Sequence, residues 1–233
     1  MKPFQAVIDY PVDNSFIVKY DNFSHFTIPL HFHNEYEIVY IIKSFGKKYV
    51  GDVIETFGPG DLSFYYNNLN HFYLNDEKFY KNDPEYYVNA IVILFPSDYF
   101  SPDKLQQPEF SQIRKLLNNS FRGLKFPEKV VGKAASLLFE MLDVWGIERY
   151  VIFLKLLDYL GASESQSIAS LGYSSAHGSI REHRMEKIYK FCRHNFTRKL
   201  TVREVSMLAA LNPAAFCRYF RRNTGKDIYR LYQ

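Results

Sequence analysis

The sequence has little of what marks secreted and membrane proteins. It contains two cysteines, Cys192 and Cys217, which are too few for a disulfide framework and lack the paired spacing of a metal site. No segment approaches the roughly 20 apolar residues of a membrane span. The N-terminal stretch MKPFQAVIDYPVDNSF also lacks the apolar core of a signal peptide. These absences predict a cytoplasmic protein with no membrane partner.

Aromatic residues and unevenly distributed charge are what the sequence has instead. It contains 19 Tyr and 21 Phe against a single Trp, and 47% of its 233 residues are hydrophobic, which predicts a folded core. From residue 184 onward, twelve Lys or Arg and three acidic residues give a net charge of +9. Since the whole chain carries +4, the first 183 residues carry −5. A basic C-terminal block favours a polyanionic partner.

A mixed fold is predicted, with strands in front and helices behind. Short apolar stretches separated by Gly, Pro, Asn and Asp run from about residue 5 to 96, which indicates an antiparallel β-sandwich or β-barrel, and we expect the barrel. From about 103 to 161 the apolar spacing changes to three and four, as in amphipathic helices. Pro127 is placed where a helix begins and Gly161 where one ends. Residues 1–161 are therefore predicted to form one domain, 162–183 a Ser-rich linker, and 184–233 an all-α domain.

The stretch LTVREVSMLAALNPAAFCRYFRRNTG predicts two short helices with a tight joint. Thr201 and Glu204 have the spacing of a capping box, which starts a helix ending near Ala209. Asn212 is a good N-cap and Pro213 suits the first helical position, so a second helix follows and ends near Gly225. This pattern predicts a helix-turn-helix.

The second of these helices has two different faces. Phe216 and Phe220 are four residues apart and are expected to face the core. The opposite face presents small residues first and arginines behind, which suits a helix lying in the major groove of DNA. Arg218 is expected to read a guanine edge, and the other basic residues to contact phosphates. The predicted DNA-binding residues are Ala214, Cys217, Arg218, Arg221, Arg222 and Lys226. The alternative is a helical hairpin with a solvated basic face.

Residues 186–233 resemble the first helix-turn-helix of AraC/XylS transcriptional regulators. The resemblance rests on the N-P dipeptide, an F-x-R-x-F core and the T-G-K end. It implies that Ala214, Cys217 and Arg218 face the groove, and that the chain ends before a second helix-turn-helix. Ala210 stands where the family usually has Gly, so an Ala at positive φ is expected there at a cost of about 1 kcal/mol.

Histidines in the front domain form a second pattern. In HFHNEYE, His31, His33 and Glu37 fall on one face of a strand, and Asp61 precedes His71 by ten residues. This spacing resembles the two motifs of cupins. We expect no bound cofactor other than a small-molecule effector, which by the family resemblance could be a sugar. The predicted ligand pocket contains His31, His33, Glu37, Tyr49, Phe64 and His71. A divalent metal on His31, His33, Glu37 and His71 is the alternative.

These features together predict a ligand-responsive, sequence-specific DNA-binding regulator that is not an enzyme. The helices near 146–161 are expected to pair two copies into a homodimer, because their apolar stripe is longer than covering a barrel requires. The competing hypothesis is a metal-dependent cupin enzyme with a helical appendage. A third alternative is an interaction module whose basic tail contacts another protein.

Overall fold

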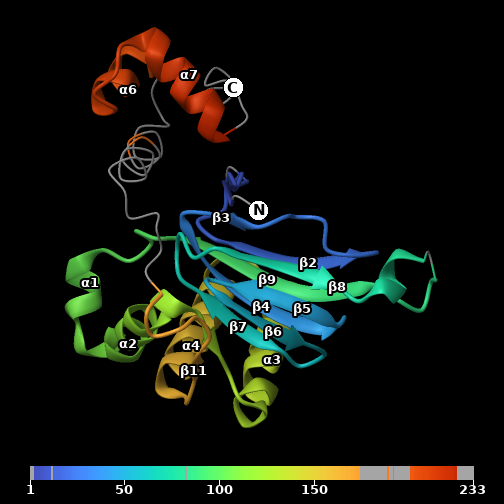
Figure 1. Ribbon diagram of the computed structural model, residues 1–233. Coiled ribbons are helices and arrows are strands. Elements are labelled where there is room, and N and C mark those ends of the chain that lie inside the picture. Colours follow the sequence, from blue (N-terminus) through green and yellow to red (C-terminus); the bar gives the residue numbers. More distant parts are fainter. Residues whose placement is uncertain are drawn as a thin grey trace. The chain divides into compact units, whose positions relative to one another are not determined.

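The computed structural model describes residues 3–11, 13–81, 83–173, 188, 191 and 200–224. The chain divides into two compact units, shown in Figure 1. The first comprises Ile8–Tyr173 with the N-terminal Met1–Pro3, and the second comprises the residues from Ser174 together with Phe4–Val7, which include the short strand β1 (Phe4–Gln5). Each unit is described by itself.

Two antiparallel sheets make up the body of the first unit. One has the order β3–β8–β5–β6 and the other β11–β10–β7–β4–β9–β2. The bounds are β2 (Ile17–Phe23), β3 (His31–Phe32), β4 (Glu35–Lys43), β5 (Gly46–Val50), β6 (Val53–Phe57), β7 (Leu62–Tyr65), β8 (His71–Asn75), β9 (Val88–Pro96), β10 (Leu124–Lys125) and β11 (Gln166–Ser167). Among the described residues no ladder joins the two sheets, so the predicted barrel is an open pair of sheets. Alternation and turn spacing predict strands, but not whether their sheets close.

The central strands of the larger sheet are buried on both faces. Alternate residues of these strands belong to two different hydrophobic cores, one on each face. On β4, Ile38 belongs to the core that faces the helices, whereas Val39 and Ile41 belong to the core between the sheets. The inner core also receives Val50 and Phe57 from the smaller sheet. The central strand β9 is buried at every position, which explains its unbroken apolar sequence VNAIVILFP. Any residue at an inward position of β4 or β7 therefore lies inside the unit.

Helices cover the other face of the six-stranded sheet (Figure 1). They are α1 (Pro102–Gln106), α2 (Ser111–Asn119), α3 (Glu128–Asp143) and α4 (Gly146–Ala162), with short 3-10 turns at η1 (Glu77–Tyr80), η2 (Pro108–Phe110) and η3 (Ser120–Arg122). Pro127 caps α3 as predicted, and α4 ends one residue beyond Gly161. Gly161 allows α4 to lie close to α2, since a Cβ there would be 2.1 Å from the carbonyl oxygen of Gln112. None of the helices in the described ranges is both long and apolar enough to cross a membrane.

Part of the predicted linker is docked on the first unit. The amide of Ile168 donates to the carbonyl of Gly123 at 3.0 Å, and the amide of Ala169 donates to that of Arg122 at 2.8 Å. The amide of Ser170 donates to the Asp52 carboxylate at 3.0 Å. Ile168 and Ala169 are buried. We call residues 166–173 the exit segment. Its apolar contacts were not predicted, because the stretch 162–183 is rich in Ser. Residues 174–183 lie outside the described ranges.

The second unit contains the predicted helix pair, α6 (Val202–Leu208) and α7 (Pro213–Thr224). The capping box of Thr201 and Glu204 is present, and the Asn212 side chain accepts from the amide of Ala215 at 2.8 Å. Ala210 has φ +50°, as expected from its place in the turn. The core of this unit consists of Ile188, Val205, Ala209, Phe216 and Phe220. The two predicted helices and the tight joint between them are thus present.

Candidate functional site

Three histidines and a glutamate meet between the two sheets of the first unit. His31 and His71 are direct partners in the β3–β8 ladder, and their ring centroids are 4.4 Å apart. His33 follows β3, with its ring centroid 5.7 Å from that of His31 and 5.1 Å from that of His71. Glu37 enters from an inward position of β4, in the other sheet, and its Oε2 is 2.8 Å from His71 Nε2 and 3.0 Å from His33 Nε2. We call these four residues the His–Glu cluster.

Backbone carbonyls fix the orientation of two of these rings. His31 Nδ1 is 2.9 Å from the carbonyl oxygen of Pro29, and His71 Nδ1 is 2.8 Å from that of Leu69. Because a carbonyl oxygen only accepts, each Nδ1 carries the proton and donates it. His33 differs, since its two ring nitrogens lie near two carboxylates, Glu37 at 3.0 Å and Glu35 at 3.5 Å.

Burial and neighbouring charges act differently on the members of the cluster. Burial lowers the pKa of His31 to about 3, and the charge of His71 acts in the same direction. Burial also disfavours the charged form of His33, but its hydrogen bond to Glu37 and the charges of Glu37 and Glu35 raise its pKa above the ordinary value. For Glu37, burial opposes ionisation, yet His71 and His33 together hold its pKa well below the usual range. The cluster therefore favours an ionised carboxylate among imidazoles.

Three residues of the cluster are grouped closely enough to hold a metal ion. One ligand atom from each of His31, His33 and His71 lies within 4.8 Å of the others, and all three side chains are buried. This is the one group of three or more His, Cys, Asp or Glu with such geometry found in the part of the chain that the structure describes. Imidazoles with a carboxylate suit Fe, Mn, Ni or Zn.

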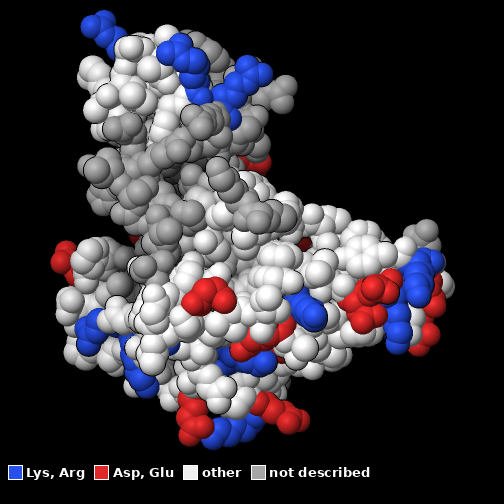
Figure 2. Space-filling view, viewed as in Figure 1, with Lys and Arg blue, Asp and Glu red and all other residues white. Residues whose placement is uncertain are grey.

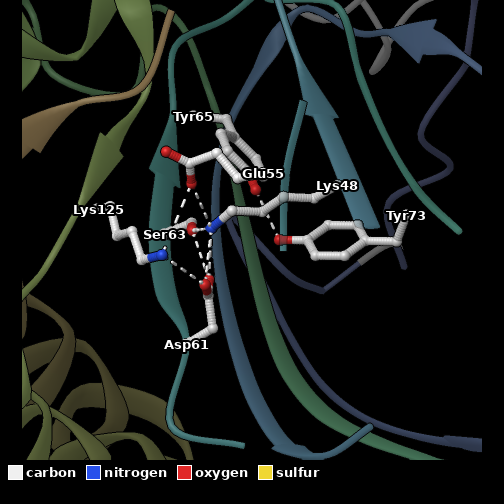
Figure 3. A network of polar contacts seen from close by, with 7 residues as sticks. All are labelled: Lys48, Glu55, Asp61, Ser63, Tyr65, Tyr73 and Lys125. Atoms are coloured by element: carbon white, nitrogen blue, oxygen red, sulfur yellow. Dashed lines mark hydrogen bonds and ion pairs between the residues drawn. The ribbon is translucent and has the colours of Figure 1, made fainter. Parts of the chain in front are cut away.

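A second group of polar side chains connects the two sheets (Figure 3). Lys48 of β5 is fully buried, and its Nζ donates to both oxygens of Asp61 at 2.7 and 2.8 Å and to Ser63 Oγ at 2.8 Å. Glu55 Oε2 lies 3.7 Å from the Nζ of Lys48 and 3.6 Å from that of Lys125. Burial lowers the pKa of Lys48, and the Asp61 carboxylate opposes this effect. We call these residues the Lys48 network.

Tyrosines connect the Lys48 network with the His–Glu cluster. The hydroxyls of Tyr65 and Tyr73 are 2.6 Å apart, one from each sheet, and burial raises the pKa of both. The ring of Tyr65 stacks on His71 with centroids 4.8 Å apart. Sequence reasoning missed Lys48. The alternation of residues along β5 could have revealed it, because Lys48 and the buried Val50 share the inward face of this strand while Tyr49 does not.

Two predicted pocket residues lie away from the cluster. Phe64 is fully buried, but it belongs to the core that faces the helices, on the opposite side of the sheet from Glu37. Tyr49 stacks on Phe72 with centroids 4.2 Å apart, on the face of β5 opposite Lys48. The register of each strand decides these positions, and composition does not reveal it. The structure thus brings together His31, His33, Glu37 and His71, and leaves Tyr49 and Phe64 apart from them.

The predicted DNA-reading residues lie on α7 of the second unit. Ala214, Arg218 and Arg221 are exposed and Cys217 is half-buried, while Phe216 and Phe220 on the other face are buried. Figure 2 shows blue Lys and Arg side chains at the surface of this unit, where the first unit mixes blue and red. Arg222 belongs to α7 but its side chain is outside what the structure describes, and Lys226 lies beyond the described residues.

Among the solved structures that the chain matches are those of transcriptional regulators. The AraC-like transcriptional activator CuxR is 10% identical, with a TM-score of 0.39, over 85% of this chain and 64% of its own. ToxT from Vibrio cholerae with a bound unsaturated fatty acid is 14% identical, with a TM-score of 0.41, over 96% and 79%. ToxT from Vibrio cholerae bound to (E)-4-(8-methylnaphthalen-1-yl)but-3-enoic acid is 13% identical, with a TM-score of 0.44, over 94% and 99%.

The chain thus spans less than two thirds of the length of CuxR. The scan against protein-family models and the search of curated proteins found no match. At these low identities and TM-scores, the function of this chain is inferred from its own residues.

Proposed function

We propose that this chain is a cytoplasmic, ligand-responsive transcriptional regulator that binds DNA in a sequence-specific manner. The single observation that carries the proposal is the two-faced helix α7, whose aromatic face fills the core and whose exposed face presents Ala214, Arg218 and Arg221. A helix with small residues at its N-terminal end approaches base edges closely, because no long side chain holds it away from the groove floor. The basic charge of the C-terminal block supports the same partner.

Within this proposal, Arg218 reads sequence and its neighbours supply affinity. A guanidinium donates two parallel hydrogen bonds to the O6 and N7 of guanine, which a lysine cannot reproduce. Arg221 is one turn further along α7, where contacts to phosphates are the expected role. The first unit is the ligand sensor, supported by the polar side chains that converge between its sheets.

The proposal includes a homodimer in which two copies of the chain contact each other through α4. The predicted stripe divides in two, because Leu157 and Leu160 are buried in the first unit while Ile147 is 76% and Val151 42% exposed. Trp145 adds a further exposed ring near the start of α4.

We expect Ile147→Asp to convert dimers into monomers in analytical ultracentrifugation. Ile54→Asp, at a 57% exposed position on β6, is the matched control and should leave the dimer intact. A monomeric parent chain contradicts the dimer.

Selection from a random duplex library tests the DNA proposal. The chain should enrich a defined sequence containing a guanine, and Arg218→Ala should weaken binding to that sequence by about 1 to 3 kcal/mol and relax the preference for that guanine. Arg218→Lys keeps the charge and should lose the preference while retaining more affinity. Lys115→Ala, an exposed charge on α2, is the control and should change neither. An unchanged preference in Arg218→Ala removes this residue from the reading face.

A further inference from the structure

We propose that the exit segment is a releasable latch. When it is docked, it fixes the chain that leads to the second unit on the first unit, and when it is released, it lengthens the connection between the units. The segment ends at Tyr173, and the second unit continues from Ser174. The effect of the latch on DNA binding rests on the proposed function, whereas its docking and release do not.

Two glycines of the first unit lie against the exit segment. Gly51 has φ +63°, and a Cβ added there would lie 2.8 Å from the Cβ of Ala169 and 3.1 Å from the ring of Tyr173. Gly123 has φ +68°, and a Cβ there would lie 3.5 Å from the side chain of Ile168. A side chain at Gly51 would thus push against the docked segment, in addition to straining its own backbone. The surface of the first unit is therefore shaped to receive this segment.

Few contacts hold the segment on this surface. Ile168 and Ala169 are buried, but Ser170 is exposed and Leu171 is 90% exposed. Its regular structure is limited to the two residues of β11, which pair with β10. Segments with few buried apolar side chains and exposed hydrogen bonds open locally while the rest of a domain stays folded. The exit segment has this character, whereas β9 of the same unit is buried at every position.

Asp52 holds the outer part of the segment. Its carboxylate accepts from both the hydroxyl and the amide of Ser170, and these two hydrogen bonds lower the pKa of Asp52. The contact lies at the surface, on the turn between β5 and β6, so water competes for the same groups. Asp52 therefore adds to the docking of the segment, but the contact is lost without unfolding the sheets.

The latch is connected to the core between the sheets. Ile168 belongs to this core together with Val50 and Leu69, and Tyr173 packs against it. A ligand or a substitution that changes the packing of this core therefore shifts the equilibrium between docked and released segment. This connection gives the first unit a means to act on the chain that leads to the second unit.

Release changes how far the second unit can reach. The eight residues 166–173 then join the connection and add up to about 26 Å to it when extended, at about 3.3 Å per residue. Two half-sites one helical turn of DNA apart are separated by about 34 Å, so the added reach is of the same order. In the proposed homodimer, a docked segment should restrict the spacing of the half-sites that are bound, and a released segment should relax it.

Native-state hydrogen exchange of the full chain tests the latch. The amides of Ile168 and Ala169, which donate to carbonyls of the first unit, should exchange by local opening, at rates that low denaturant concentrations do not change. The amides of β9 should exchange faster as denaturant is added, because they open only when the unit unfolds. The same denaturant dependence for both sets of amides overturns the latch.

Ala169→Leu is expected to release the segment without altering the surface that receives it. The longer side chain has no room against Gly51, so the amide of Ile168 should exchange at least about tenfold faster, while those of β9 stay unchanged. Asp52→Ala should have a smaller effect, about fivefold, and Asp52→Asn, which keeps an acceptor oxygen, a smaller one still. Ala162→Leu, at the exposed end of α4, is the matched control and should change nothing. Unchanged exchange in Ala169→Leu, or faster exchange in β9 as well, overturns the latch.

DNA binding then tests the role of the latch. On duplexes that carry two copies of the enriched sequence at different spacings, the parent chain should bind one spacing at least about fivefold more tightly than the others, and Ala169→Leu should lose this preference. The same spacing preference in both chains overturns the effect on DNA binding and leaves the release of the segment standing. If neither chain binds any duplex, the proposed function fails, while hydrogen exchange still decides the latch.

Discussion

The two units place their chemically important residues in opposite ways. In the first unit the polar side chains lie inside, where Lys48 and three histidines are surrounded by the two sheets. In the second unit the core is mainly apolar and contains Phe216 and Phe220, while Arg218 and Arg221 of α7 are exposed. An interior polar site suits a small ligand that is enclosed, and an exposed basic face suits a large anionic partner that cannot be enclosed.

This difference has consequences for stability. Charges inside the first unit must remain paired, because a buried charge that loses its partner also lacks water. Charges on α7 are solvated whether or not DNA is bound, so their removal affects binding more than folding. Removal of a charged side chain should therefore mainly destabilise the fold in the first unit and mainly weaken binding in the second.

The largest expected effect is in the interior of the first unit. Lys48→Met removes the ammonium that donates to both oxygens of Asp61 and leaves this buried carboxylate with Ser63 Oγ at 2.8 Å and Lys125 Nζ at 3.5 Å, so it should lower the free energy of unfolding by about 3 kcal/mol. Denaturant unfolding followed by the fluorescence of Trp145, the single Trp of the chain, measures this unit. The double variant Lys48→Met with Asp61→Leu removes both charges and should recover most of the loss. A loss below about 1 kcal/mol for Lys48→Met alone means that the pair is solvated.

A smaller effect is expected at the start of α6. Thr201→Ala removes the side chain that accepts from the amide of Glu204, and should destabilise the helix by about 1 kcal/mol. Hydrogen exchange of peptides from residues 200–224 should become faster, while peptides from the first unit stay unchanged. Thr56→Ala, on β6, is a matched control. Faster exchange throughout the chain contradicts the independence of the two units.

The smallest effect is a gain in stability. Ala210 has φ +50°, where Gly is better tolerated, so Ala210→Gly should stabilise the turn by about 0.5 to 1 kcal/mol. Slower hydrogen exchange of α6 and α7 is the expected observation. Ala214→Gly, in the first turn of α7, should have the opposite sign, because Gly is a poorer helix former than Ala. Two changes of the same sign contradict the assigned backbone conformation.

The second unit could be predicted from the sequence because its signals are local. The capping box, the Asn-Pro start of α7 and the spacing of Phe216 and Phe220 each span five residues or fewer, and the structure has all three. Even the strained Ala210 follows from its place in the turn.

Prediction of the first unit was partial because its contacts are remote in sequence. The odd spacing of His31, His33 and Glu37 predicted one face of a single strand, but His31 lies in β3 and Glu37 in β4 of the other sheet, so these residues meet across the two sheets. Lys48 and Asp61 are 13 residues apart and meet only because the two sheets pack against each other, so no local pattern predicted their contact. Phe64 and Tyr49 were assigned to the pocket because aromatic composition does not specify which face a residue occupies. The exit segment was taken for a linker because the stretch 162–183 is rich in Ser.

The salt dependence of duplex-DNA binding tests the central claim most directly. For the parent chain, the logarithm of the association constant should fall linearly with the logarithm of salt concentration, with a slope of about −0.9 for each phosphate that the protein neutralises. We predict a steep slope for non-specific duplexes, and on the enriched duplex tighter binding that Arg218→Ala removes. Binding that is absent at low salt, or that shows neither a salt slope nor dependence on Arg218, contradicts the proposal that α7 reads DNA.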